Sequence, residues 1–68
     1  MKLEVEFLKK LGFYEMDSTT YQKDNDLLGI SILYYTDCDC FSVFYNTDEI
    51  ICCSKSYKEF VEVLQKVL

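Results

Sequence analysis

Runs of β-branched and aromatic residues, interrupted by short turn-forming segments, dominate the middle of this 68-residue chain. The runs cover residues 19–23, 28–36, 41–46 and 50–53. Asp, Asn and Cys residues concentrate in the segments between them, at residues 24–26, 37–40 and 46–48. Since Asp and Asn favour tight turns and strands joined by tight turns lie antiparallel, the pattern predicts a small antiparallel meander.

Apolar residues at helical spacing mark both ends of the chain. Near the N-terminus they predict a helix over about residues 2–11, ended by Gly12, with Phe13 packing behind it. Near the C-terminus an i, i+3, i+4, i+7 stripe predicts a second helix, and Ser56 with Glu59 has the spacing of a capping box. The stripe consists of Tyr57, Phe60, Val61, Leu64, Val67 and Leu68.

These elements predict one α+β domain over residues 1–68, in the order helix, three- to four-stranded antiparallel β-meander, helix. Residues 13–17 have two interpretations, a further short strand or an irregular crossing. With half of its residues apolar and 16% aromatic, the chain has the composition of a folded domain. At this length the core is close to the minimum that sustains a fold without a metal, a disulfide or a partner.

Turn positions predict which residues share a face of the sheet. If residues 37–40 close one hairpin and Thr47 and Asp48 the next, Val43 lies opposite Tyr34 on one side and Cys52 on the other. We expect both helices mainly on the apolar face that results. It carries Ile30, Ile32, Tyr34, Phe41, Val43, Tyr45, Ile50 and Cys52.

The second face is also partly apolar in this register. Leu33, Phe44 and Ile51 lie side by side on it, with Tyr35 next to them. Two short helices are too small to cover both faces, so either the helices divide between them or an apolar strip is open to solvent. An open strip is typical of an oligomer or partner surface. A register slip of one residue would exchange the two faces.

The negative charge is regional. Residues 24–54 carry six acidic residues and no lysine or arginine, whereas the rest of the chain nets +1, which gives −5 overall. A meander places alternate turns at opposite ends of the sheet, so we expect Asp24, Asp26, Asp48 and Glu49 at one end. Asp37 and Asp39 should lie at the other. The acidic turns have two interpretations, solubilising turn residues or a surface that engages a basic partner.

The four cysteines have several interpretations. Cys38 and Cys40 with Cys52 and Cys53 are enough thiolates for a zinc site, but neither spacing is the usual one for a zinc ligand pair. Cys40 and Cys53 are diagonal neighbours in the predicted register, so a disulfide is sterically conceivable, but without a secretion signal we expect the two thiols to be reduced. Small apolar roles, with Cys52 in the core, are the simplest expectation. The acidic pair Asp37 and Asp39 lacks the glycine and late glutamate of an EF-hand, so we expect no cofactor or metal there.

Missing residue types exclude several functions. Without histidine there is no imidazole base, and without arginine there is no bidentate phosphate ligand. The two isolated glycines form no phosphate-binding loop, and the acidic middle repels nucleic acid. We therefore expect neither an enzyme nor a nucleic-acid-binding protein. The absence of a signal-like N-terminus and of about 18 consecutive apolar residues favours a cytoplasmic, membrane-free location.

In size and charge the chain resembles phage-encoded inhibitors of host defence and small bacterial immunity or antitoxin proteins. Its preference for residues with AT-rich codons fits a low-GC bacterium or its mobile elements. The leading hypothesis is an inhibitor or accessory factor that binds a larger basic protein. Its own negative charge would mimic that of a nucleic acid. A homodimer formed through the second sheet face is the alternative, and a zinc module the third hypothesis. The predicted partner-binding residues are Asp24, Asp26, Asp37, Asp39, Asp48, Glu49, Leu33, Tyr35, Phe44 and Ile51.

Overall fold

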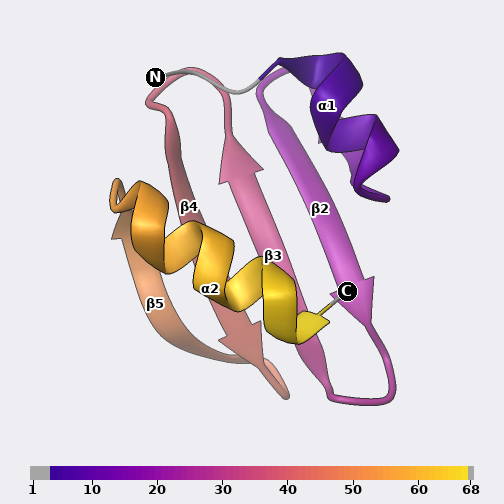
Figure 1. The fold of residues 1–68 in the computed structure, drawn as a ribbon, viewed down its shortest axis with the longest axis vertical. Coiled ribbons are helices and arrows are strands. Elements are labelled where there is room, and N and C mark those ends of the chain that lie inside the picture. Colours follow the sequence, from indigo (N-terminus) through magenta and orange to yellow (C-terminus); the bar gives the residue numbers. More distant parts are fainter. Residues whose placement is uncertain (1–3, 68) are drawn as a thin grey trace.

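The computed structural model describes residues 4–67 and confirms an α+β fold. Its five strands form one antiparallel sheet in the order β1-β2-β3-β4-β5 (Figure 1). The elements are α1 (Val5–Lys10), β1 (Tyr14–Asp17), β2 (Thr20–Asn25), β3 (Ile30–Tyr35), β4 (Cys40–Tyr45), β5 (Asp48–Ser54) and α2 (Tyr57–Val67).

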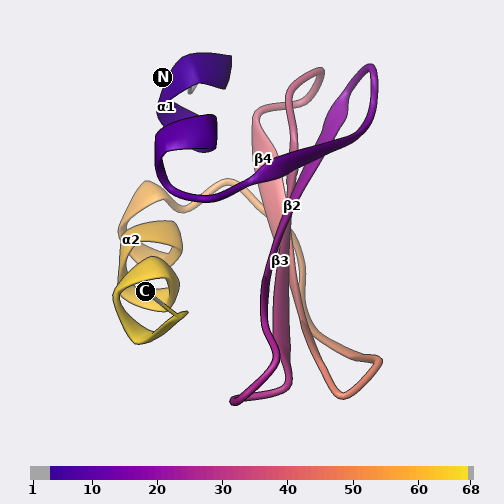
Figure 2. The ribbon, with the colours of Figure 1, turned by 90° about the vertical axis from the view of Figure 1, so that its right-hand side faces the viewer.

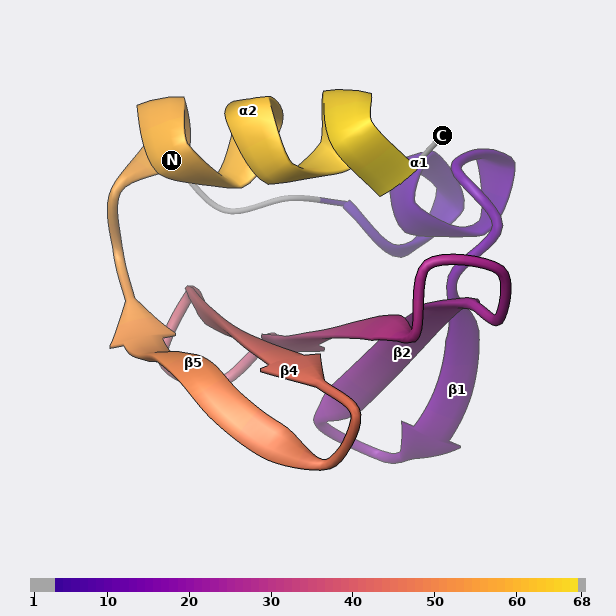
Figure 3. The ribbon, with the colours of Figure 1, turned by 90° about the horizontal axis from the view of Figure 1, so that it is seen from below.

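The molecule has two layers. Both helices lie on the same side of the sheet, as Figure 2 shows, in agreement with the predicted single covered face. The sheet is curved, and its edge strands β1 and β5 bend away from the helices (Figure 3). The core fills the space between the layers. It consists of Leu8, Phe13, Tyr21, Ile32, Tyr34, Phe41, Val43, Phe60, Leu64 and Val67.

The strand count is five, so the predicted three to four strands were too few. Residues 13–17, for which two interpretations were open, contain the short edge strand β1, which pairs antiparallel with β2. All four of its residues are exposed. Tyr14, Glu15, Met16 and Asp17 do alternate between apolar and polar residues. The run is only four residues long and none of its side chains is buried, so the pattern does not separate a strand from an irregular crossing.

Local signals define how α1 ends. Gly12 has φ +96° and its amide donates to the carbonyl of Lys9 at 3.0 Å, while the Phe13 amide donates to the Leu8 carbonyl at 3.0 Å. These are the two hydrogen bonds of a Schellman motif, and they confirm the glycine stop. The predicted start at residue 2 lies outside the described residues, and Glu4 is extended rather than helical.

The second helix begins at the predicted cap, because the Ser56 hydroxyl accepts a hydrogen bond from the Glu59 amide at 3.2 Å. Phe60, in the first turn of α2, packs on the sheet, with its ring centroid 4.9 Å from that of Phe41 and 5.9 Å from that of Tyr34. Phe60, Leu64 and Val67 are buried, whereas Tyr57 and Val61 stay partly exposed. Leu68 lies outside the described residues.

The pairing of β3 with β4 differs from the predicted one by two residues. Ile32 is opposite Val43 and Tyr34 is opposite Phe41. A shift of two keeps every side chain on its predicted face, because side chains alternate with period two. Phe41, Val43, Ile32 and Tyr34 therefore all point toward the helices, as expected.

The pairing of β4 with β5 required a correction that does exchange faces. The turn is formed by Asn46 and Thr47, with φ 49° and 77°, so the hairpin closes one residue earlier than predicted. Two irregularities follow in β5, and they bring Ile51 opposite Val43. Ile51 packs against the core, while Ile50 is 58% exposed and Cys52 is also exposed. The predicted positions of Ile50, Ile51 and Cys52 were wrong.

Candidate functional site

The β2–β3 and β4–β5 turns lie together at one end of the sheet (Figure 1). The Asn46 amide donates a hydrogen bond of 2.9 Å to the Gly29 carbonyl, which joins the two turns directly. We call this end of the sheet the acidic tip. Its residues are Asp24, Asp26, Leu27, Leu28, Tyr45, Asp48, Glu49 and Ile50. The structure thus brings together the four carboxylates that the turn pattern assigned to one end.

Asn25 fixes the acidic tip to the rest of the fold. Its side-chain oxygen accepts a hydrogen bond from the Leu28 amide at 3.1 Å, within the β2–β3 turn. Its side-chain nitrogen donates to the carbonyl of Val67, at the end of α2, at 2.8 Å. The turn is therefore held by the sheet on one side and by α2 on the other.

Four large apolar side chains of the acidic tip are exposed. Leu27 is 98% exposed, Ile50 58%, Tyr45 47% and Leu28 45%. The sequence interpretation overlooked them, since it assigned Leu28 to a strand and placed Tyr45 and Ile50 on the covered face. The available signal was the pair Leu27 and Leu28 between Asp26 and Gly29, where a turn must expose both leucines.

Asp24 lies near the end of β2, where neighbouring side chains donate hydrogen bonds to it. Its carboxylate accepts hydrogen bonds from the Tyr14 hydroxyl at 2.6 Å and the Gln22 side-chain amide at 2.7 Å. Desolvation alone would raise the pKa of Asp24, but hydrogen bonds from Tyr14, Gln22 and Ser31 outweigh it and lower the pKa. Asp24 is thus held in place and ionised, and no local sequence pattern indicates its three donors.

The sheet face opposite the helices carries three of the predicted apolar partner residues. Leu33, Tyr35 and Phe44 lie there, and each is half-buried although no helix covers them (Figure 2). They cover small neighbours on the same face, including Ser42, which is fully buried, and Cys40. The predicted strip, with Leu33, Phe44 and Ile51 side by side, is not formed. Leu33 lies opposite Ser42, Phe44 lies between Ser31 and Glu49, and Ile51 packs against the core on the other face.

Charge is unevenly distributed between the two sides of the sheet. On the uncovered face, Asp24, Ser31, Phe44 and Glu49 form one cross-strand row that has a carboxylate at each end. The five strands contain a single lysine, Lys23, and its pairing with Ile32 puts it on the helix side. The other described lysines lie in the helices or in the β5–α2 connection. Within residues 4–67, therefore, no strand presents a lysine on the uncovered face.

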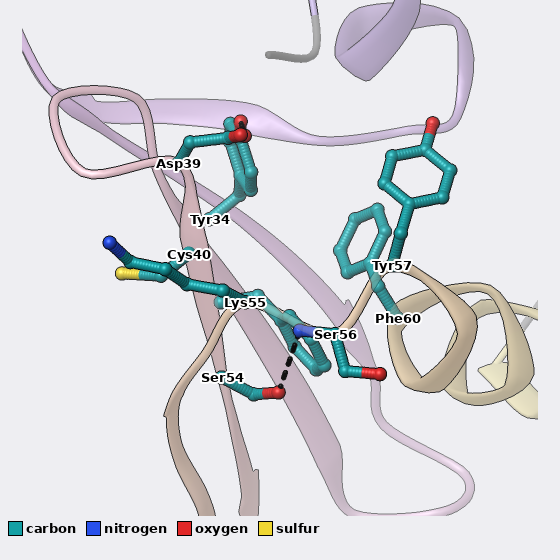
Figure 4. A pocket seen from close by; sticks show the side chains of 9 residues that line it. Tyr34, Asp39, Cys40, Ser54, Lys55, Ser56, Tyr57 and Phe60 are labelled. Carbon is teal, nitrogen blue, oxygen red and sulfur yellow. Dashed lines mark hydrogen bonds between the residues drawn. The ribbon is translucent and has the colours of Figure 1, made fainter. Parts of the chain in front are cut away.

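The opposite end of the sheet is different. Asp37 is exposed, whereas Asp39 is half-buried and its carboxylate accepts a hydrogen bond from the Tyr34 hydroxyl. Asp39 and Tyr34 line a pocket of about 70 Å³ together with Lys55 and Phe60 (Figure 4). Ligand pockets are usually about 300–1,000 Å³, so this one is too small for a substrate or an organic cofactor.

The cysteines are all free thiols. Cys38, Cys52 and Cys53 are exposed and Cys40 is buried, so the core cysteine is Cys40 and not the predicted Cys52. Within residues 4–67, no group of three or more Cys, Asp or Glu side chains has an arrangement that could hold a metal ion. The zinc hypothesis gains no support from the geometry.

No protein family, curated protein or solved structure matches the chain. In the part of the chain that the structure describes, no helix combines the length and the apolar character needed to cross a membrane.

Proposed function

We propose that this protein is a binding module, acting as an inhibitor or accessory factor, that engages a larger basic protein through the acidic tip. The observation that carries the proposal is the 98% exposure of Leu27, which directly follows Asp26 at the end of the sheet that also carries Asp48 and Glu49. Exposed apolar groups of this kind, rimmed by polar residues, are typical of interaction sites. The partner surface should therefore combine lysines or arginines with an apolar hollow.

The two kinds of side chain have different roles in this proposal. Asp26, Asp48 and Glu49 attract the basic partner and accelerate encounter, an effect that added salt screens. Leu27 and Ile50 supply the apolar contact that holds the complex together once water is expelled. The hydrogen bonds of Asn25 and Asn46 keep the two turns in place, which reduces the entropy lost on binding.

The charge distribution supports a partner that normally binds nucleic acid. Such proteins present lysine and arginine side chains to phosphates, and an array of fixed carboxylates offers them the same sign of charge. Asp24 is suited to this role because its three hydrogen bonds favour ionisation. Competition between this protein and DNA or RNA for the partner is the expected consequence.

The test compares variants of the acidic tip with a matched variant at the other end of the sheet. A protein captured by the wild-type chain from a bacterial lysate at low salt is purified, and its association is then measured with each variant. The triple variant Asp26→Asn, Asp48→Asn, Glu49→Gln should associate about tenfold more slowly at low salt and show a weaker salt dependence. Leu27→Ser should dissociate roughly tenfold faster or more, since it removes one buried leucine from the interface.

Asp37→Asn is the control, because it removes one exposed carboxylate from the opposite end of the sheet. It should bind like the wild type. If the triple variant and Leu27→Ser bind the captured protein as tightly as Asp37→Asn does, the acidic tip is not the binding surface and the proposal fails.

The homodimer is the second candidate, and the uncovered sheet face with Leu33, Tyr35 and Phe44 is the observation that favours it. In a symmetric pair, however, the carboxylates of Asp24 and Glu49 on that face would approach those of the second copy. Sedimentation at micromolar concentration separates the two functions. A dimer that Phe44→Asp converts to a monomer would establish self-association through this face. A wild-type chain that is monomeric would exclude the homodimer.

A further inference from the structure

The four cysteine thiols lie near one another where β4 pairs with β5. The Cys40 thiol is close enough to those of Cys38 and Cys53 to interact with them electrostatically, and the Cys53 thiol is similarly close to that of Cys52. Cys38 belongs to the β3–β4 turn and Cys40 to β4, while Cys52 and Cys53 belong to β5. Cys40 and Cys53 are therefore the two thiols that meet across a strand boundary.

The backbone of β5 is distorted where it brings Cys53 toward β4. Regular pairing is interrupted between Phe41 and Val43, and Cys53 there has φ +48°, a conformation rarely adopted by residues other than glycine. The Cys53 amide donates to the hydroxyl of the fully buried Ser42 at 3.0 Å. This hydrogen bond and the distorted strand fix Cys53 beside β4. Diagonal side chains in a regular antiparallel pair are usually too far apart to join.

The two thiols differ in access. Cys53 is exposed to solvent, whereas Cys40 is 3% exposed and lies at the edge of the pocket that Lys55 and Ser54 also line (Figure 4). Burial, with the neighbouring thiols of Cys38 and Cys53, raises the pKa of Cys40 to about 12. A dissolved reagent can therefore reach Cys53 first, and Cys40 can react only with a group already attached next to it.

We propose that Cys40 and Cys53 form a dithiol site, which a small-molecule disulfide oxidises to an interstrand disulfide. This site is independent of the acidic tip and of the proposed binding function. Cys52 is a poorer partner for Cys53, because consecutive Cα atoms are about 3.8 Å apart and ordinary disulfides need about 4.4–6.8 Å. Cys38 is the competing partner, and the experiment below separates it from Cys53.

The reaction proceeds in two balanced steps. The Cys53 thiolate attacks one sulfur of the small disulfide, which forms a mixed disulfide and releases one small thiolate. Cys40 then loses its proton and attacks the sulfur of Cys53, which forms the protein disulfide and releases the second small thiol. Overall two protein thiols are oxidised by two electrons, and one small disulfide is reduced to two thiols.

Oxidised glutathione is the probe. The folded protein is incubated with it, free thiols are then blocked with N-ethylmaleimide, and the protein is digested. Trypsin alone is uninformative, because all four cysteines lie between Lys23 and Lys55. Additional cleavage after Glu49 separates Cys38 and Cys40 from Cys52 and Cys53. The four free thiols should fall to two, and the two fragments should stay joined until a reductant is added.

Variants identify the bonded pair. Cys53→Ser is the main one, since its side chain is exposed and the variant should fold; it should abolish the joined fragments. Cys52→Ser and Cys38→Ser are the matched controls and should leave the joined fragments unchanged. The proposal is overturned if the wild-type fragments separate without reductant, if Cys53→Ser still joins them, or if Cys38→Ser abolishes the link.

Discussion

The hydroxyl of Tyr14 donates a hydrogen bond of 2.6 Å to the carboxylate of Asp24, across the β1–β2 edge of the uncovered sheet face. This contact joins the edge strand to a charged group of the acidic tip. It also explains why the pKa of Tyr14 is raised, with the hydrogen bond to Asp24 as the largest cause, while the pKa of Asp24 is lowered. The hydrogen bond thus favours the neutral hydroxyl of Tyr14 and the ionised carboxylate of Asp24, which are the forms present at neutral pH.

Tyr14→Phe should therefore raise the pKa of Asp24 toward the unfolded value of about 3.9. Because the wild-type folded pKa is below that value, Asp24 contributes stability above about pH 4, and the contribution is lost as the pH falls through the folded pKa. The variant should be less stable than wild type at neutral pH, and the difference should disappear in acid. NMR titration of the Asp24 carboxyl measures the pKa, and urea unfolding at several pH values measures the difference in stability. Tyr45→Phe, which removes an exposed hydroxyl elsewhere, should shift neither quantity.

Phe60 should be the most costly position to truncate. It is 3% exposed and its ring contacts those of Phe13, Tyr34 and Phe41. Phe60→Ala removes about 3–5 kcal/mol, which is comparable with the total stability of a domain of this size. We expect an unfolded chain by far-UV circular dichroism. Phe60→Leu should remain folded with a lower unfolding midpoint, and a folded Phe60→Ala protein would show that the core does not depend on this ring.

Gly29 should not tolerate a side chain. Its φ is +69°, and a Cβ there would collide with the side chain of Asn46. Gly29→Ala should destabilise the fold by about 1–2 kcal/mol, measured by urea unfolding. Asn46→Gly removes the colliding group and suits φ 49° at that position. In that background the cost of Gly29→Ala should shrink to the backbone contribution, and an unchanged cost would exclude the collision.

Cys53 and Cys52 provide a matched pair for testing backbone strain. Both are exposed, but only Cys53 has a positive φ, of 48°. Replacing either by glycine adds the same freedom to the unfolded chain, whereas only Cys53→Gly relieves a left-handed conformation. Cys53→Gly should be more stable than Cys52→Gly by about 1–2 kcal/mol in thermal unfolding under reducing conditions. Equal stabilities would show that the conformation costs little.

Several parts of the fold could be predicted from residues that are close together in the sequence. Gly12 ends α1 and Ser56 begins α2 because capping depends on residues within one turn of the helix end. The alternation of Ile30–Tyr35 and Cys40–Tyr45 assigned β3 and β4 to the correct faces, even with the pairing displaced by two residues. The acidic residues next to the β2–β3 and β4–β5 turns lie at the same end of the sheet because consecutive strands of a meander run in opposite directions.

The errors concern contacts between distant residues. Ile51 and Ile50 are equally apolar, and the choice of which one is buried depends on the positive φ values of Asn46 and Thr47 and on the irregular pairing of β5 with β4. The strand β1 alternates between apolar and polar residues over only four positions and all its side chains are exposed, so its pairing with β2 is what defines it as a strand. Neither the choice between the two isoleucines nor the pairing of β1 is set by a local pattern.

By itself, then, the sequence determined the fold class, the two helices, the direction of the central strands and the separation of charge along the chain. Period, capping and turn preference are local properties, and they suffice for these features. Only the tertiary structure decided that Asp24 is held by Tyr14 and that Ile50 is exposed while Ile51 packs against the core. Those relationships depend on hairpin closure and strand distortion, where differences of one residue in register reverse the direction of a side chain.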